Sequence, residues 1–84
     1  MNDDKTLIDI RSEISYRQGH IPNARNIPAN YLLLNYKKYL KKEKIYYIYC
    51  QNGLTSKRVV QKLNSLGYNT RNYEGGYNQY LSNK

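Results

Sequence analysis

The sequence has one cysteine, one histidine and two prolines, and it lacks tryptophan and phenylalanine. A single cysteine cannot close a disulfide within the chain, so nothing indicates an oxidising compartment, and we expect a cytoplasmic protein. No apolar stretch approaches the roughly 20 residues that span a membrane. The polar N-terminus MNDDKT also lacks the basic and apolar regions of a secretion signal, so we expect neither export nor membrane association.

Acidic residues are few: six Asp and Glu stand against 14 Lys and Arg, which gives a formal net charge of +8. Such a balance favours anionic partners in general. Five lysines fall within eight residues: Lys37, Lys38, Lys41, Lys42 and Lys44. No nucleic-acid-binding motif accompanies this run, so we interpret it as a solvated helix face and a loop. We therefore expect small anions or acidic proteins as partners, and no nucleic acid.

The 84 residues suffice for one modest core, and no linker, repeat or low-complexity segment divides them, so we expect a single domain over 1–84. All aromatic residues are tyrosines, 11 in number. Core rings must therefore bring a hydroxyl group to water or to a hydrogen-bond partner.

Short apolar runs alternate with amphipathic segments along the chain. The patterns predict strands at 6–10, near 25–27, at 44–49 and at 68–73. The run KIYYIY at 44–49 lacks the alternation of a half-exposed strand, which indicates a strand covered on both faces, as in parallel sheets. Helices are predicted from Ser12 to Gly19, from Ala29 to about Lys41, from near Ser56 to Gly67, and at 77–83. This order predicts an α/β fold with a largely parallel central sheet flanked by helices.

Cys50 directly follows the predicted strand at 44–49, and ligands of open α/β sheets bind beyond the carboxyl ends of the strands. Free N–H groups and the helix dipole at the next helix start would stabilise a thiolate, and Lys57 and Arg58 add cationic charge. We therefore expect the pKa of Cys50 to be lowered. Gly53 lets successive N–H groups converge on one anion. Position and composition alone leave two interpretations open, a nucleophile or a small buried residue.

Three motifs, in the same order, resemble those of the rhodanese domain family. YCQNGLTS at 49–56 resembles its active-site loop, LIDIRSEISYRQGHIPNARNIP at 7–28 its N-terminal signature, and YEGGYNQY at 73–80 its Gly-Gly motif with a following aromatic residue. The resemblance implies a small rhodanese-like α/β domain with sulfurtransferase activity. In that family a loop cysteine takes a sulfane sulfur from thiosulfate or a persulfide, including a low-molecular-weight one. It then passes the sulfur to cyanide, a thiol or a protein.

The resemblance makes Cys50 the nucleophile and the carrier of the persulfide. The substrate-binding residues that it implies are Gln51, Asn52, Gly53, Leu54, Thr55 and Ser56, through their N–H groups, with Lys57 and Arg58 beside them. Asp9, Arg11 and His20 match scaffold positions, and for His20 we favour a structural role over proton transfer. Neither a cofactor nor a metal ion is implied.

The chain departs from the family pattern at four places. Thr55 stands where many members have an arginine, so side-chain charge for thiosulfate is missing there, and Lys57 or Arg58 could supply it. Ser15 replaces an acidic residue that commonly pairs with the signature arginine, and Tyr80 replaces a tryptophan. The segment that many members place before the first signature strand is absent, so we expect a minimal version of the fold.

Three other functions stay open as alternatives. A thiolate phosphatase needs an arginine six residues after its cysteine to bind phosphate, and Ser56 occupies that position here. An arsenate reductase would need resolving thiols, and Cys50 is the only cysteine. A non-catalytic rhodanese-like binding module is the alternative outside enzymes, and the presence of the cysteine argues against it.

Overall fold

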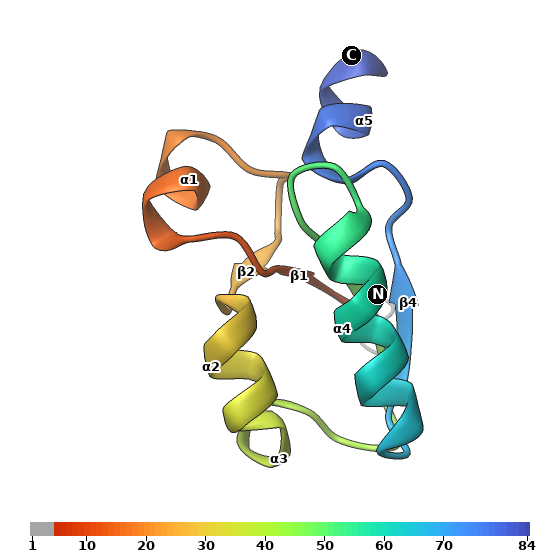
Figure 1. Cartoon of the computed structure of the whole chain (residues 1–84). Helices are drawn as coiled ribbons and strands as arrows, with labels where there is room; N and C mark the ends of the chain where they lie inside the picture. The colour runs from red at the N-terminus through yellow and green to blue at the C-terminus, as the bar shows by residue number, and fades with distance from the viewer. Residues whose placement is uncertain (1–4) are drawn as a thin grey trace.

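The computed structural model describes residues 5–84 (Figure 1). Strands and helices alternate in this range. Their bounds are β1 Lys5–Asp9, α1 Glu13–Gln18, β2 Arg25–Asn26, α2 Ala29–Leu34, α3 Tyr36–Tyr39, β3 Ile45–Tyr49, α4 Leu54–Ser65, β4 Asn69–Asn72 and α5 Gly76–Ser82. None of the helices in this range is long and apolar enough to cross a membrane.

The four strands form one parallel sheet in the order β2-β1-β3-β4. The two central strands pair in register from Lys5 with Ile45 to Asp9 with Tyr49. Because all strands run the same way, their carboxyl ends meet at one edge, where Figure 1 shows the loop before α4 close to the start of α5. The predicted α/β fold with a largely parallel sheet is confirmed.

The sheet packs a hydrophobic cluster on each face. On one face Ile8, Ile48 and Cys50 pack with Leu32 of α2 and Leu63 of α4. On the other face the fully buried Tyr49 packs with residues around α1 and α5: Tyr16, Ile21, Ala24, Tyr73, Tyr77 and Tyr80. The alternation of a strand places successive side chains on opposite faces, so adjacent residues Tyr49 and Cys50 belong to different clusters.

Two buried tyrosines hydrogen-bond in the way that the composition predicts. The hydroxyl oxygen of Tyr49 accepts a hydrogen bond from the N–H of Ile21 at 3.1 Å. That of Tyr46 accepts one from the N–H of Lys41 at 2.8 Å. Each ring thus fills the core while its polar end is satisfied.

The single helix predicted from Ala29 to about Lys41 is in fact two helices, α2 and α3. Asn35 lies between them with φ −128° and ψ 32°. Its side-chain amide donates to the carbonyl oxygen of Tyr31 at 3.1 Å, a local bond of the kind that competes with helix continuation. The apolar periodicity correctly predicts helical structure in this range, but it does not show where a helix is interrupted.

Helix α4 begins at Leu54, earlier than the predicted start near Ser56. Gly53 precedes it with φ 92°, in the left-handed region that glycine adopts readily, and this turns the chain directly into the helix. The side chain of Asn52 accepts a hydrogen bond from the N–H of Leu54 at 3.1 Å. As a result Ser56 lies in the first turn of α4 and is fully buried.

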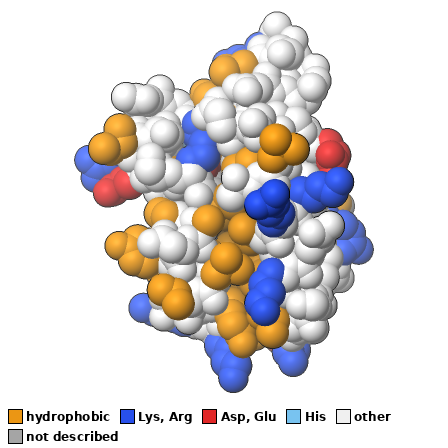
Figure 2. All heavy atoms as spheres, viewed as in Figure 1, with side chains coloured by type: hydrophobic (Ala, Val, Ile, Leu, Met, Phe, Trp, Pro, Cys, Tyr) orange, Lys and Arg blue, Asp and Glu red, His pale blue; other side chains and the backbone are white. Residues whose placement is uncertain are grey.

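On the side of the molecule formed by α2 and α4, basic side chains lie over α4 and not over α2, which contains no Lys or Arg. Figure 2 shows Lys and Arg over α4 and at the end of the molecule where α3 lies, with few acidic side chains between them. Most lysines of the 37–44 run are exposed, as a solvated helix face requires. That end of the molecule is opposite the loop that holds Cys50 (Figure 1).

Candidate active site

The sulfur of Cys50 lies at the carboxyl end of β3, almost completely buried, and three polar groups surround it. The N–H groups of Gly53 and Ser56 donate to Sγ at 3.1 and 3.3 Å. The thiol itself donates to Oγ of Ser56 at 3.3 Å. The loop therefore turns its backbone donors inward, toward the position where an anionic sulfur would sit.

These donors determine the acidity of the thiol. Burial raises the pKa of Cys50, but the hydrogen bond with the hydroxyl group of Ser56 and those from the N–H groups of Ser56, Gly53 and Asn52 outweigh burial, and the pKa is lowered. The direction is the predicted one. The charges of Lys57 and Arg58 are not among its largest causes, and both residues are exposed.

The Gly-Gly turn packs directly against the cysteine loop. A Cβ atom at Gly53 would lie 2.8 Å from the nitrogen of Gly75, and one at Gly76 would collide with the carbonyl oxygen of Cys50. The N–H of Tyr77 donates to that carbonyl oxygen at 2.9 Å, and the N–H of Asn78 donates to the carbonyl oxygen of Gln51 at 2.9 Å. The start of α5 thus fixes the loop, which requires backbone approach that only glycine allows.

Asn72, which the sequence analysis did not single out, reaches the same place from β4. Its Oδ1 accepts a hydrogen bond from Oγ of Ser56 at 2.5 Å. Its Nδ2 donates to the carbonyl oxygen of Gly53 and to Oε2 of Glu74, both at 3.2 Å. A polar residue near the end of the strand beside β3 was the available signal, since parallel strands end at one edge.

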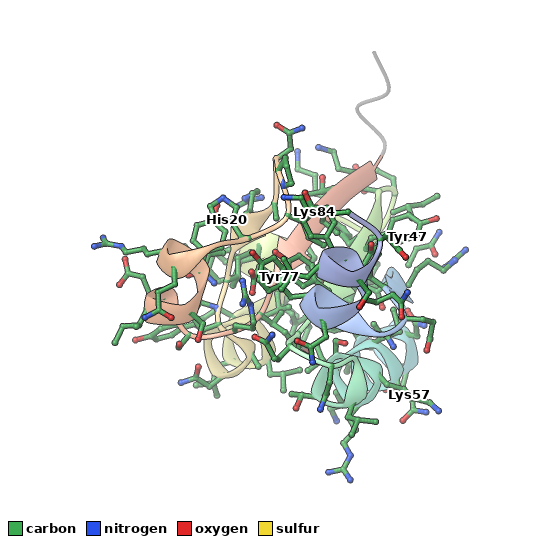
Figure 3. The ribbon with its side chains drawn as sticks, turned by 90° about the horizontal axis from the view of Figure 1, so that it is seen from above. His20, Tyr47, Lys57, Tyr77 and Lys84 are labelled. Carbon is green, nitrogen blue, oxygen red and sulfur yellow. The ribbon has the colours of Figure 1, made fainter. Side chains whose placement is uncertain are left out.

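The other predicted substrate-binding residues divide into two groups. Backbone groups of Asn52, Gly53 and Ser56 face the sulfur. The residues of the predicted set with exposed side chains are Gln51, Asn52, Leu54, Thr55, Lys57 and Arg58. Figure 3 shows Lys57 at the periphery of the molecule, whereas Tyr77 lies near its centre. No charged side chain of the loop therefore points at the sulfur.

A cavity of about 430 Å³ lies elsewhere, among side chains that include Leu7, Arg25, Tyr47 and Tyr73. None of the loop residues lines it. Within residues 5–84, no group of three His, Cys, Asp or Glu side chains is placed to hold a metal ion. The chemical feature of the loop is the thiol of Cys50, whose pKa is lowered.

Comparisons with known proteins agree with this geometry. The profile of the rhodanese-like domain family matches residues 1–83. The uncharacterized protein YqhL of Bacillus subtilis is 37% identical over 75 residues, which cover 88% of this chain and 59% of that protein. The thiosulfate sulfurtransferase GlpE of Coxiella burnetii is 34% identical over 65 residues, 77% of this chain and 60% of that enzyme.

The chain belongs to the rhodanese-like domain family. A rhodanese-related protein from Thermoplasma volcanium superposes with a TM-score of 0.86 at 31% identity, covering 95% of this chain and 79% of that one. A human single-domain sulfurtransferase superposes with a TM-score of 0.80 at 29% identity, covering 96% and 84%. The family and fold that the three motifs imply are confirmed. The chain spans about three fifths of the length of YqhL and of GlpE.

In this rhodanese-like domain Arg11 forms its ion pair with Asp9. Arg11 therefore has an acidic partner although position 15, where an acidic residue is common, is a serine. Nη2 of Arg11 lies 2.7 Å from Oδ2 of Asp9, and the two side chains are only 7% and 0% exposed. The same guanidinium donates to Oε1 of Gln51 at 3.1 Å and stacks on the ring of Tyr77 at 4.3 Å. The guanidinium of Arg11 thus has a structural role: it pairs with Asp9 and contacts Gln51 of the cysteine loop.

Two further family positions have structural roles. Tyr80, at the usual tryptophan position, packs against the cluster around Tyr49 and stacks on Tyr77 with ring centroids 5.9 Å apart. His20 stacks on the ring of Tyr16 at 3.7 Å, and its Nδ1 lies 2.8 Å from the carbonyl oxygen of Tyr16. These contacts tie the end of α1 to the following turn, which agrees with the structural role favoured for His20.

Proposed function

We propose that this rhodanese-like domain is a sulfurtransferase that carries a sulfane sulfur as a persulfide on Cys50. The observation that supports the proposal most is the convergence of the Gly53 and Ser56 N–H groups on Sγ at the carboxyl end of β3. The chain's similarity to named sulfurtransferases agrees with it. A merely structural cysteine would have no need of such donors.

The chemistry has two half-reactions that need no oxidant or reductant. The Cys50 thiolate attacks the outer sulfur of the donor, the donor's sulfur–sulfur bond breaks, and the leaving group departs with the electron pair, as sulfite if the donor is thiosulfate. A nucleophilic acceptor then attacks the outer sulfur of the persulfide. The bond to Cys50 breaks, the thiolate is regenerated, and the acceptor leaves as thiocyanate or as a new persulfide.

The loop would stabilise each anion of this cycle. Backbone N–H groups from Gln51 through Ser56 form the proposed cradle for the outer sulfur and the departing anion. Lys57 and Arg58 are exposed on α4, so we propose that they attract anionic donors from a distance rather than bind them at the sulfur.

A persulfide fits this loop better than thiosulfate as a donor. Thiosulfate carries two negative charges, and Thr55 supplies no guanidinium to meet them. The persulfide group of a low-molecular-weight persulfide or of a partner protein carries a single negative charge, so it needs fewer cationic groups in the loop. The net charge of +8 suits a partner protein with an acidic surface.

Mass spectrometry tests the proposal directly. The purified protein is incubated with a small-molecule persulfide or with thiosulfate and then weighed intact, before and after addition of cyanide. We expect a mass increase of one sulfur atom that cyanide removes and that Cys50→Ser abolishes. A protein that never gains sulfur from either donor would favour a binding module instead. A Cys50→Ser variant that gains as much sulfur would show that Cys50 is not the carrier.

A further inference from the structure

The hydroxyl group of Ser56 lies between the sulfur of Cys50 and the amide oxygen of Asn72, and both can accept a hydrogen bond once Cys50 is a thiolate. Its Oγ is 3.3 Å from Sγ of Cys50 and 2.5 Å from Oδ1 of Asn72. Ser56 is fully buried, so water does not share its hydrogen bonds. A hydroxyl group has a single hydrogen to donate, so it can serve only one of these acceptors at a time.

The orientation of the Asn72 amide follows from its other contacts. Nδ2 faces the carbonyl oxygen of Gly53 and the carboxylate of Glu74, both of which accept hydrogen bonds. Each takes one amide hydrogen, so Oδ1 must face Ser56. Oδ1 cannot donate, and the short contact therefore requires the Ser56 hydrogen to point at Asn72.

This arrangement suits the thiol form of Cys50. The thiol donates to Ser56, and Ser56 donates to Asn72, so both hydrogens in this row of hydrogen-bonded side chains, Cys50–Ser56–Asn72, have an acceptor. The thiolate form has no hydrogen and needs donors instead. Ser56 can serve it only by turning its hydrogen from Asn72 to the sulfur, which leaves Oδ1 of Asn72 without that partner.

We propose that Asn72 is a positioning residue for sulfur transfer: it competes with the Cys50 thiolate for the hydrogen of the Ser56 hydroxyl group. When the thiolate forms, the hydrogen turns to Sγ. When Cys50 carries a persulfide, the charge moves to the outer sulfur, and the hydrogen returns to Asn72. Asn72 thus keeps the thiolate more basic, and a more basic thiolate is a stronger nucleophile toward the donor sulfur.

Other charged groups surround this row without joining it. Glu74 in the turn before α5 contacts Asn72 and not the sulfur. Arg11, which follows β1, is paired with Asp9 and touches Gln51, the neighbour of Cys50. Lys57 and Arg58 on α4 are exposed. A test of the proposal must therefore separate the hydrogen bond from these charges.

The test measures the rate of Cys50 alkylation by iodoacetamide against pH in four variants. Asn72→Val removes the competing acceptor and suits a strand position. We expect it to lower the apparent pKa of Cys50 by about half to one pH unit, because Ser56 then donates to the thiolate at no cost. In a Ser56→Ala background the same substitution should have no such effect. Glu74→Gln, which keeps an acceptor oxygen, measures the contribution of charge and should shift the pKa less.

If the role of Asn72 were purely structural, Asn72→Val would shift the pKa of Cys50 in the opposite direction. Its Nδ2 also holds the carbonyl oxygen of Gly53, so loosening the loop would weaken the N–H donors and raise the pKa of Cys50. An unchanged or raised pKa in Asn72→Val, or a lowering that persists with Ser56→Ala, would overturn the inference. If Asn72→Val does not melt cooperatively, Asn72→Ala answers the same question with the same expected sign.

The inference rests on Cys50 being the reacting thiol of the proposed function, but alkylation needs no sulfur donor. A protein that shows the predicted shift and never gains sulfur would overturn the proposed function and leave the role of Asn72 standing. A protein that gains sulfur normally, but whose Asn72→Val variant lacks the predicted shift, would support the proposed function and overturn the role of Asn72.

Discussion

The α-carbon of Gly76 packs against the backbone carbonyl group of Cys50. The two are so close that a Cβ atom at Gly76 would collide with the Cys50 carbonyl oxygen. Through this contact the Gly-Gly turn fixes the backbone at Cys50. The turn and the cysteine are distant in the sequence, and the N–H of Tyr77 locks them together at 2.9 Å.

Gly76→Ala should therefore damage both stability and the site. Gly76 has φ 62°, which costs an alanine about 1 kcal/mol, and the collision with the Cys50 carbonyl adds to this. We expect a loss of about 2–4 kcal/mol in the free energy of unfolding, measured in urea, and at least a tenfold fall in sulfur transfer.

Gly67→Ala is the matched control. Gly67 also has a positive φ, 96°, but a Cβ there meets only the flexible end of Lys42, at 3.4 Å. It should lose only the backbone term, about 1 kcal/mol, and keep its rate of sulfur transfer. Equal losses in the two variants would refute the importance of the contact between Gly76 and the cysteine loop.

Arg11→Ala should destabilise the fold strongly because Asp9, which is fully buried, would lose its counter-charge. We expect a loss of about 3–5 kcal/mol in urea unfolding. Arg17→Ala is the control, because Arg17 and Glu13 form an ion pair that is largely exposed. Its loss should stay below about 1 kcal/mol. A loss in Arg11→Ala as small as that in Arg17→Ala would show that the buried Asp9 does not depend on Arg11.

Thr55→Arg should improve the use of thiosulfate. Thr55 is exposed in the first turn of α4, and a guanidinium there could meet the sulfonate end of the donor with paired hydrogen bonds. We expect kcat/KM for thiosulfate to rise about tenfold, with a smaller change for a persulfide donor, which carries one negative charge instead of two. Asn30→Arg, on exposed α2, adds the same charge elsewhere and should change neither. A similar gain from Asn30→Arg would assign the effect to net charge.

The lowered pKa of Cys50 has a consequence for stability. A group whose pKa is lower in the folded state stabilises that state once it is ionised, and this contribution is lost as the pH falls through the lowered pKa. The free energy of unfolding of the wild type, minus that of Cys50→Ser, should therefore grow as the pH rises through the lowered pKa of Cys50 toward the ordinary pKa of a thiol, about 8.5. It should level off above the ordinary pKa of a thiol. Subtraction removes the titration of the tyrosines and lysines that both proteins share, and a flat or falling difference would mean that the folded loop does not favour the thiolate.

Much of the fold follows from local patterns in the sequence. The apolar run 44–49 and the cysteine after it are enough to place Cys50 at the carboxyl end of a buried strand. Ser12 and Gly19 bound α1 as their types predict, since the Ser12 hydroxyl oxygen accepts from the N–H of Ser15 and Gly19 ends the helix. These features depend on residues a few positions apart, which the sequence displays directly.

Other features of the fold depend on a single residue that the apolar periodicity does not reveal. The apolar spacing from 29 to 41 is continuous, yet Asn35 divides the helix by bonding back to Tyr31. The start of α4 moved from near Ser56 to Leu54 because Gly53 takes a left-handed conformation. Periodicity reports which face is buried, but it does not report where the backbone changes direction.

The sequence by itself determined the parallel α/β fold, the family and the residue that we propose as the nucleophile, because strand periodicity, glycine positions and motif order are local or ordered along the chain. Only the tertiary structure decided that Asn72 shares the Ser56 hydroxyl with Cys50, that Gly76 abuts the cysteine carbonyl, and that Lys57 and Arg58 stay at the surface. The physical reason is that strand pairing brings β4 beside β3, and contacts of a few ångströms between distant residues leave no periodic trace in the sequence.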